Sequence, residues 1–211
     1  MKKKKGLFIV FEGPEGAGKT TQARLLYKYF KKRHYDVILT REPGGTKVAE
    51  KIRKIILSPK IKISSLTELL LYEACRAQHI AEIILPNLKK GKIVISDRFT
   101  FASVVYQGYA RGLGVKLVED LNKLVVGDIT PDITFVLDIE PKEGLKRVKK
   151  RTGYFDRLEK ENLKFHKKIR EGYIKLSKNK KNVFVVDAQN KSAHQVHLTV
   201  LEILKRNFNY I

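Results

Sequence analysis

The feature that most constrains this chain is a glycine-rich segment placed directly after an apolar run. The run covers residues 7–11 (LFIVF) and has the composition of a buried strand, while the glycine-rich segment covers residues 13–21 (GPEGAGKTT). In residues 22–30 the apolar positions then recur with helical periodicity. Glycines permit backbone angles closed to other residues, so successive N–H groups can converge on one anion at the positive end of the following helix. The segment is therefore predicted to be a P-loop that binds phosphate.

Two side chains of this loop have the chemistry that a nucleoside triphosphate requires. Lys19 would reach the β and γ phosphates, and the Thr20 hydroxyl would bind the Mg²⁺ that accompanies them. We expect the nucleotide to be held by the loop and the start of its helix, namely Gly13, Glu15, Gly16, Ala17, Gly18, Lys19, Thr20 and Thr21.

The length and composition favour a single-domain protein without a membrane-spanning segment. A chain of 211 residues can bury one substantial core, so a single domain over residues 1–211 is predicted. No apolar run approaches the roughly 20 residues that span a bilayer, and the first residues lack the apolar core of a signal peptide. We therefore expect a cytoplasmic protein that makes no membrane contact. The lone Cys75 is expected to be a small buried hydrophobe.

The chain is strongly basic. Lys and Arg outnumber Asp and Glu by 44 to 22, which gives a formal net charge of +22. Such a field attracts nucleotides and, without specificity, nucleic acid. The excess is spread over several short runs, which favours solvated lysines on exposed faces over a specific nucleic-acid site. Abundant Lys with a single Met and a single Cys also leans towards a heat-adapted source.

Strand-like and helix-like segments alternate along the whole chain. Further strands are expected at 36–40, 92–97, 133–138 and 182–187, and helices at 48–57, 66–88, 100–111, 115–126, 141–152 and 192–204, with a long basic helix ending near 178. This alternation predicts an α/β fold, in which a five-stranded parallel sheet is flanked by helices.

Two more segments are expected at the carboxyl ends of strands, where open α/β sheets bind ligands. One is residues 41–46 (REPGGT), in which a Pro and two Gly stop regular structure. The other ends at Asp97, and an apolar strand ending in Asp has the form of a Walker B segment, which presents a carboxylate to the Mg²⁺ beside a P-loop. The same Asp could also cap the helix that follows.

Four blocks of sequence together resemble the thymidylate kinase family, over a span from Phe11 to about Asp187. The blocks are residues 11–22, residues 40–46, residues 97–99 with 106–108, and residues 151–159. The resemblance implies transfer of the ATP γ-phosphate to dTMP, giving dTDP and ADP for dTTP biosynthesis. It also implies the P-loop NTPase architecture of the nucleoside monophosphate kinases, a short basic lid at about 147–157, and a homodimer formed through helices.

The same resemblance assigns the acceptor site residue by residue. Glu15 would approach the 3′-hydroxyl of dTMP, while Arg53 and Arg98 would hold its phosphate. Glu42 and Pro43 would lie against that phosphate, and the peptide bond before Pro43 is expected to be cis.

Side chains of two helices are expected to contact the nucleoside. The resemblance implies that Tyr72 stacks on thymine and that Arg76 reaches the thymine O4. Their four-residue spacing puts both on one helical face, as a stack plus an edge contact requires. Ser103 and Gln107 would address the base edge, and Tyr106 would crowd the sugar C2′ and disfavour ribonucleotides.

The transfer itself is expected to depend on charge neutralisation rather than on a base. The acceptor is already a phosphate with a second pKa near ~6, so its oxygen attacks without a strong general base. P-loop positions 14–17 (PEGA) offer no cation, so the resemblance points to the lid for one. Catalytic roles are expected for Lys19, Asp97, Arg98 and Arg151, with Mg²⁺ bound by Thr20 and Asp97.

Three alternative functions remain open at this point. Tyr72 stands where the family usually has Phe, and Ala102 stands where many relatives have Ser, so the acceptor could be dUMP or another monophosphate. A methyl group contributes only roughly 1–3 kcal/mol to such a choice. A GTP-dependent switch would need an Asn-Lys-x-Asp motif, which the chain lacks. A nucleic-acid-dependent NTPase would use the net charge and would respond steeply to salt.

Overall fold

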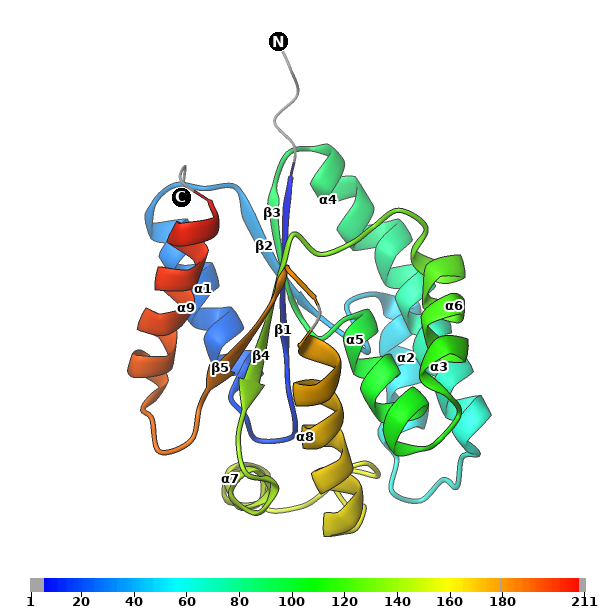
Figure 1. Cartoon of the computed structure of the whole chain (residues 1–211). Helices are drawn as coiled ribbons and strands as arrows, with labels where there is room; N and C mark the ends of the chain where they lie inside the picture. Colours follow the sequence, from blue (N-terminus) through cyan, green and yellow to red (C-terminus); the bar gives the residue numbers. More distant parts are fainter. Residues whose placement is uncertain (1–5, 179, 209–211) are drawn as a thin grey trace.

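The computed structural model describes residues 6–178 and 180–208, and its centre is a parallel five-stranded sheet (Figure 1). The sheet is parallel, as predicted for a chain in which strands and helices alternate, and its strand order is β2-β3-β1-β4-β5. All five predicted strands are confirmed, with bounds β1 Leu7–Glu12, β2 Val37–Arg41, β3 Ile93–Asp97, β4 Ile133–Asp138 and β5 Val183–Asp187.

The register of the central strands brings the predicted ligand segments together. Phe11 of β1 pairs with Asp97 of β3, and Asp97 pairs in turn with Arg41 of β2. Every residue of β1 is buried, because a parallel strand in the middle of such a sheet is covered on both faces. The P-loop, the end of β3 and the loop after β2 therefore leave the sheet side by side.

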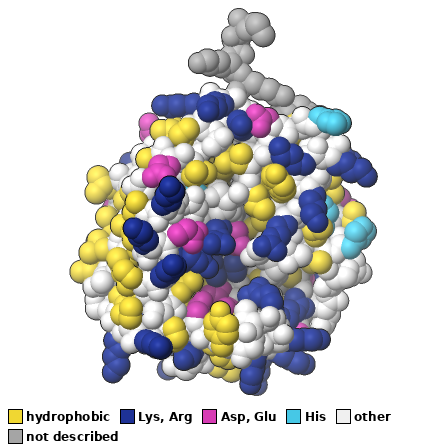
Figure 2. Space-filling model, turned by 180° about the vertical axis from the view of Figure 1, so that it is seen from behind, with side chains coloured by type: hydrophobic (Ala, Val, Ile, Leu, Met, Phe, Trp, Pro, Cys, Tyr) yellow, Lys and Arg dark blue, Asp and Glu magenta, His cyan; other side chains and the backbone are white. Residues whose placement is uncertain are grey.

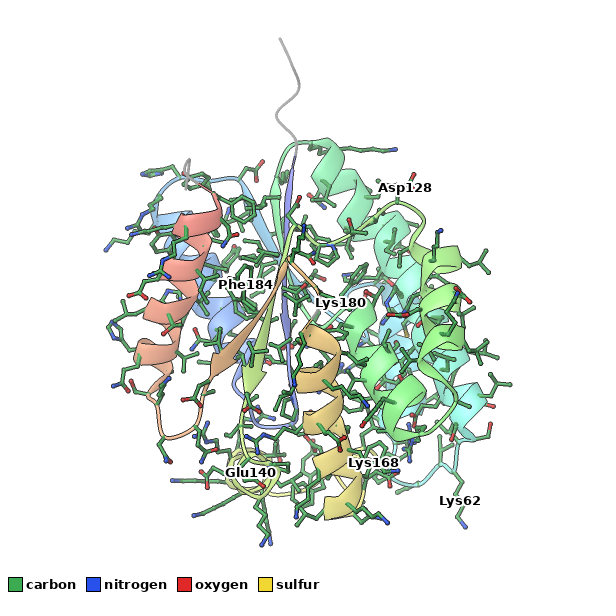
Figure 3. The ribbon with its side chains drawn as sticks, viewed as in Figure 1. Lys62, Asp128, Glu140, Lys168, Lys180 and Phe184 are labelled. Carbon is green, nitrogen blue, oxygen red and sulfur yellow. The ribbon has the colours of Figure 1, made fainter. Side chains whose placement is uncertain are left out.

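Two helices cover one face of the sheet. α1 (Lys19–Lys32) and α9 (Ala193–Asn207) lie together to the left of the strands in Figure 1. Their apolar sides pack on alternate strand residues such as Ile9, Ile95 and Phe135, and Phe184 of β5 also packs there (Figure 3). Ser192 caps α9 through a full capping box, which confirms the predicted helix start.

The remaining helices form the other layer and the edge of the sheet. α3 (Ser65–His79), α6 (Val115–Val126) and α8 (Leu163–Ser177) lie to the right in Figure 1. α2 (Lys47–Leu57) packs against α3. Alternate residues on this face of the sheet, including Val10 and Val136, contribute to its core.

Two of the predicted helices contain π-helical segments that periodicity did not predict. The segment expected as one helix over 66–88 comprises α3, η1 (Ile80–Ile84) and α4 (Leu85–Lys89), and Pro86 lies in the first turn of α4. The segment expected over 100–111 comprises α5 (Thr100–Ser103) and η2 (Val104–Ala110). Such π segments insert an extra residue into a turn and occur frequently at functional sites.

No helix within residues 6–178 and 180–208 has the length and apolar composition needed to span a membrane.

A close backbone contact joins the P-loop to α7 (Pro141–Thr152), which lies where the strands end (Figure 1). A Cβ atom added to Gly144 would come within 2.1 Å of the Glu15 carbonyl oxygen, and one added to Gly16 within 2.0 Å of the Gly144 carbonyl oxygen. The helix that leads into the expected lid is therefore seated directly on the phosphate-binding loop.

This contact predicts an unusual effect for Gly144→Ala. In an ordinary helix interior the change would stabilise the protein by about 0.5–1 kcal/mol. Here the added methyl group has to push the P-loop and α7 apart, so we expect destabilisation of about 1–3 kcal/mol in chemical unfolding. Lys146→Ala, at an exposed position of the same helix, is the control and should change stability by less than about 0.5 kcal/mol. A Gly144→Ala protein as stable as the wild type would show that the contact is loose.

Candidate active site

A pocket opens at the carboxyl ends of β1, β2 and β3 and gathers nearly all of the predicted site residues. Three of them lie outside its lining, namely Gly13, Ala17 and Arg76. The structure adds seven residues that were not predicted: Arg41, Leu57, Ala102, Val148, Asp156, Leu158 and Glu159. Arg41 and residues 156–159 belong to the blocks that carried the family resemblance, so they could have been found. Nothing in the sequence distinguishes Leu57 and Val148 from other apolar residues of a helix, so their place in the lining could not have been predicted.

The P-loop connects a strand to a helix, as predicted, and the Lys19 side chain folds back over the loop. Gly18 is left-handed (φ 98°) and immediately precedes α1. The Lys19 ammonium donates to the carbonyl oxygens of Gly13 (2.8 Å) and Pro14 (2.7 Å). Burial, together with the nearby Arg98 charge, lowers the pKa of Lys19 to about 8, although neighbouring carboxylates oppose the shift. Lys19 is thus a buried cation at the loop where an anion would bind.

Arg98 forms the junction between the P-loop and the end of β3. Its guanidinium donates to the Glu15 carboxylate (2.7 Å) and to the Tyr106 hydroxyl (3.1 Å), and that hydroxyl donates to Glu15 (2.8 Å). The Arg98 backbone is left-handed (φ 76°), an uncommon conformation for a non-glycine residue. Burial alone would raise the pKa of Glu15, but Arg98 and Lys19 lower it to about 2. Glu15 is therefore a fixed carboxylate facing the pocket.

A second buried carboxylate lies behind this junction. Glu12 is completely buried and accepts hydrogen bonds from the Phe99 N–H (2.8 Å), the Ala102 N–H (3.1 Å) and the Tyr173 hydroxyl (2.8 Å). It thereby ties β1 to the segment after Arg98 and to α8. Burial raises the pKa of Glu12 to about 7, against the lowering effects of Arg98, the Phe99 N–H, Tyr173 and Lys19.

The predicted metal ligands lie next to one another. The Thr20 hydroxyl is hydrogen-bonded to the Asp97 carboxylate at the mouth of the P-loop. Oxygen ligands of this kind suit Mg²⁺, which usually binds one or two protein oxygens and takes its remaining ligands from phosphates and water. In the described part of the chain no group of three or more His, Cys, Asp or Glu residues could form a denser metal site.

The loop after β2 has the predicted cis peptide bond between Glu42 and Pro43. Arg53, whose side chain lines the pocket, donates to the Pro43 carbonyl oxygen (2.7 Å). Glu42 is held from behind by Arg76 (2.9 Å) and by the His79 ring (3.0 Å). From the sequence alone, His79 was expected to be an ordinary surface or packing residue.

Arg76 does not line the pocket, whereas the other residues expected at the base do. Arg76 is 1% exposed, and all five of its N–H donors have protein partners. These partners are the Glu42 and Glu73 carboxylates, the Asn122 side chain, the Phe99 carbonyl oxygen and the Ser103 hydroxyl. Arg76 therefore lies behind the pocket lining, and its contact with the thymine O4 stays a prediction.

The expected lid residues differ in their surroundings. Arg151 lines the main pocket and also a neighbouring cavity shared by Ala17, Thr21 and Arg147, so it lies between the two. Arg147 pairs with Glu143 (3.4 Å) on the same helix. Arg157 donates to the Ile56 carbonyl oxygen (2.7 Å) and pairs with Glu68 (2.6 Å), which directs it away from the pocket.

The raised pKa of Glu12 predicts a pH dependence of stability that Glu12→Gln should remove. Because its pKa is 4.5 ordinarily and about 7 in the folded state, the native protein binds the extra proton between these values. Stability should therefore fall as pH rises from about 5 to 7, by an amount on the order of 3 kcal/mol. We expect this slope to be lost in chemical unfolding of Glu12→Gln and kept in Glu202→Gln, which changes an exposed carboxylate. Parallel curves for the wild type and Glu12→Gln would contradict the assignment.

Comparison with known proteins agrees with this geometry. The family model for thymidylate kinase matches residues 11–200. The chain is 48% identical over 202 residues to a thymidylate kinase of Thermoanaerobacter sp. (strain X514), covering 96% of this chain and 98% of that protein. It is 43% identical over 206 residues to the thymidylate kinase of Halothermothrix orenii, covering 95% and 97%.

A solved structure shows the same fold. The crystal structure of thymidylate kinase from Ehrlichia chaffeensis superposes with a TM-score of 0.78 at 36% identity, covering 95% of this chain and 99% of that one. The chain therefore belongs to the thymidylate kinase family, whose members phosphorylate dTMP to dTDP with ATP.

Proposed function

We propose that this chain transfers the γ-phosphate of Mg·ATP to dTMP, giving dTDP and ADP, within the cytoplasm. The observation that carries the proposal is that one pocket holds both a P-loop lysine and a separate set of arginines. Lys19 belongs to the donor side, while Arg53 and Arg98 belong to the acceptor side. Two anions that repel each other can be brought together only where cations surround both.

The protein's own contribution to the reaction is positioning. The P-loop N–H groups and Lys19 hold the donor phosphates, and Arg53 and Arg98 hold the acceptor phosphate. Glu15 is kept ionised by Arg98 and Lys19, so it can accept a hydrogen bond from the 3′-hydroxyl of the sugar. Tyr106 closes the sugar side and is fixed by its hydrogen bond to the same carboxylate.

The residues at the mouth of the P-loop would hold Mg²⁺. Thr20 and Asp97 would be its two protein ligands, and the ion would neutralise the charge that develops between the β and γ phosphates. Arg151 would complete that neutralisation from the lid side and would help to exclude water.

The base is proposed to stack on Tyr72, with Ser103 and Gln107 at its edge. Tyr72 lines the pocket together with Leu57, so the ring has an apolar neighbour. dUMP is the closest competing acceptor, because it differs from dTMP by a single methyl group. We place dTMP first because the chain belongs to the thymidylate kinase family.

The distribution of charge on the surface gives less support to a nucleic-acid-dependent NTPase. Figure 2 shows Lys and Arg side chains scattered over the visible face rather than gathered into one stripe. A stripe or single patch would be the electrostatic footprint of a nucleic-acid site.

A homodimer is proposed to form through α2, α3 and α6. These helices lie next to one another, since α2 contacts α3 and α3 contacts α6. Each carries two large apolar side chains that are at least 44% exposed: Val48 and Ile55, Leu66 and Leu70, and Leu117 and Leu124. Exposed apolar groups on adjacent helices are typical of a protein–protein interface.

The test of this function is ADP release from Mg·ATP with a panel of acceptors. The panel is dTMP, dUMP, ribothymidine monophosphate, dCMP, AMP and single-stranded DNA. We expect the highest kcat/KM with dTMP and no stimulation by DNA. Equal or higher kcat/KM with another acceptor, or hydrolysis stimulated by DNA and lost with salt, would contradict the proposal.

Arg151→Ala tests the lid assignment. Arg151 lies between the two cavities and is exposed, so its loss should affect the transition state more than stability. We expect kcat to fall at least about a hundredfold, with the KM for dTMP and the melting temperature little changed. Lys150→Ala, at the exposed neighbouring position, is the matched control and should stay within threefold of wild type. If Arg151→Ala also stayed within threefold, Arg147 would become the candidate, because Arg157 is already bound to Glu68.

A further inference from the structure

Arg157, at the carboxyl end of the expected lid, holds the last turn of α2, from which it is distant in the chain. Its Nε atom donates to the Ile56 carbonyl oxygen (2.7 Å), and its backbone N–H donates to the Leu57 carbonyl oxygen (3.1 Å). The last four carbonyl groups of an α-helix have no partner within the helix. Ser58, which follows α2, has φ −63°, so it does not supply the left-handed cap that many helices have. Arg157 acts as the cap instead, and its charge suits the negative end of the helix dipole.

The same guanidinium reaches a second helix beside α2. Its Nη1 atom pairs with Glu68 on α3 (2.6 Å), and the two side chains are only 12% and 1% exposed. Arg53, which is proposed to hold the acceptor phosphate, lies one turn before Leu57 on α2, and both residues line the pocket. Arg157 does not line the pocket, so any effect that it has on the acceptor passes through α2.

The residues around Arg157 form a closed turn that faces the pocket. The Asp156 carboxylate accepts hydrogen bonds from the N–H groups of Leu158 and Glu159 (both 2.9 Å), and the Glu159 carboxylate accepts one from the Asp156 N–H (2.9 Å). These three residues line the pocket. Leu158 is buried in the core cluster against which Leu57 packs. Hydrogen bonds and apolar packing thus join this turn to the end of α2.

The expected lid is therefore attached to the rest of the protein at both ends. At its amino end Val148 is buried, and α7 is seated on the P-loop through Gly144. At its carboxyl end Arg157 is fixed on α2. The residues between, 149–154, are exposed and include Arg151. Fixing either end reduces the conformational entropy that is lost when Arg151 is placed against a donor phosphate.

We infer that Arg157 is a positioning residue that couples the two substrates: it ties α2 to the lid, so that bound dTMP orders the lid and tightens the binding of the donor nucleotide. This inference rests on the proposed function. Bound dTMP fixes α2 through Arg53, and Arg157 transmits that order to the segment that carries Arg151. Because coupling between two sites is reciprocal, the donor nucleotide tightens the binding of dTMP by the same factor.

The experiment measures the Kd of Mg·AMP-PNP, a non-hydrolysable ATP analogue, by calorimetry without dTMP and with saturating dTMP. The first Kd divided by the second is the coupling factor, and saturation with dTMP compensates for weaker dTMP binding in a variant. We expect Arg157→Met, which removes the side-chain cap of α2, to lower the coupling factor at least about fivefold. The Kd of the analogue without dTMP should stay within about twofold of wild type.

Arg111→Met is the matched control, because it breaks the same buried ion cluster without uncapping α2. Arg111 pairs with Glu68 (3.2 Å) and with Glu161 (2.7 Å). In the part of the chain that the structure describes, its side chain donates no hydrogen bond to α2. The control should therefore keep the coupling factor within about twofold of wild type. If Arg157 only stabilised the fold, the two variants would behave alike.

Hydrogen exchange in the wild-type protein provides a test that does not depend on the folding of a variant. We expect dTMP alone to slow amide exchange in residues 149–154 at least about fivefold, because it orders the lid before any donor binds. Three results would overturn the inference: unchanged exchange in this segment, an unchanged coupling factor in Arg157→Met, or an equal fall in Arg111→Met. A wild-type protein that does not phosphorylate dTMP would instead contradict the proposed function, so the two failures are distinguishable.

Discussion

The contact between Arg98 and Glu15 is the interaction on which the rest of the site depends. It joins the loop after β1 to the end of β3, so the segments that we propose bind the donor and the acceptor are fixed relative to each other. Parallel pairing of Phe11 with Asp97 brings the two strand ends together, and the left-handed backbone at Arg98 directs its side chain across the gap. Preorganised charge of this kind avoids reorganisation during phosphoryl transfer.

Buried titratable side chains then support the walls of the pocket from behind. Glu12 holds the segment that follows Arg98, Arg76 holds Glu42 and Ser103, and Glu68 holds Gln107. Each is buried, and a buried ion is tolerated only when partners satisfy its hydrogen-bonding groups. Removing one partner would therefore lower the stability of the protein and also displace the side chains that line the pocket.

The sequence predicted the strands, the P-loop and most of the lining because these depend on local patterns. Apolar runs are typical of buried parallel strands, and glycines placed between such a run and a helical pattern are typical of a phosphate-binding turn. The depth of Arg76 could not be predicted, because helical spacing gives the face of a residue and not its partners. The π segments and the support from Glu68 and His79 were missed for the same reason: they are set by contacts between elements distant in the chain.

The most direct test is a crystal structure with dTMP and a non-hydrolysable ATP analogue bound together. If the Arg98–Glu15 junction sets both subsites, the acceptor oxygen should lie about 3–3.5 Å from the γ phosphorus, as a near-attack geometry requires. Arg98 should then contact the dTMP phosphate while its contact with Glu15 remains. A complex in which Arg98 leaves Glu15, or in which dTMP binds away from Arg53 and Tyr72, would contradict this arrangement.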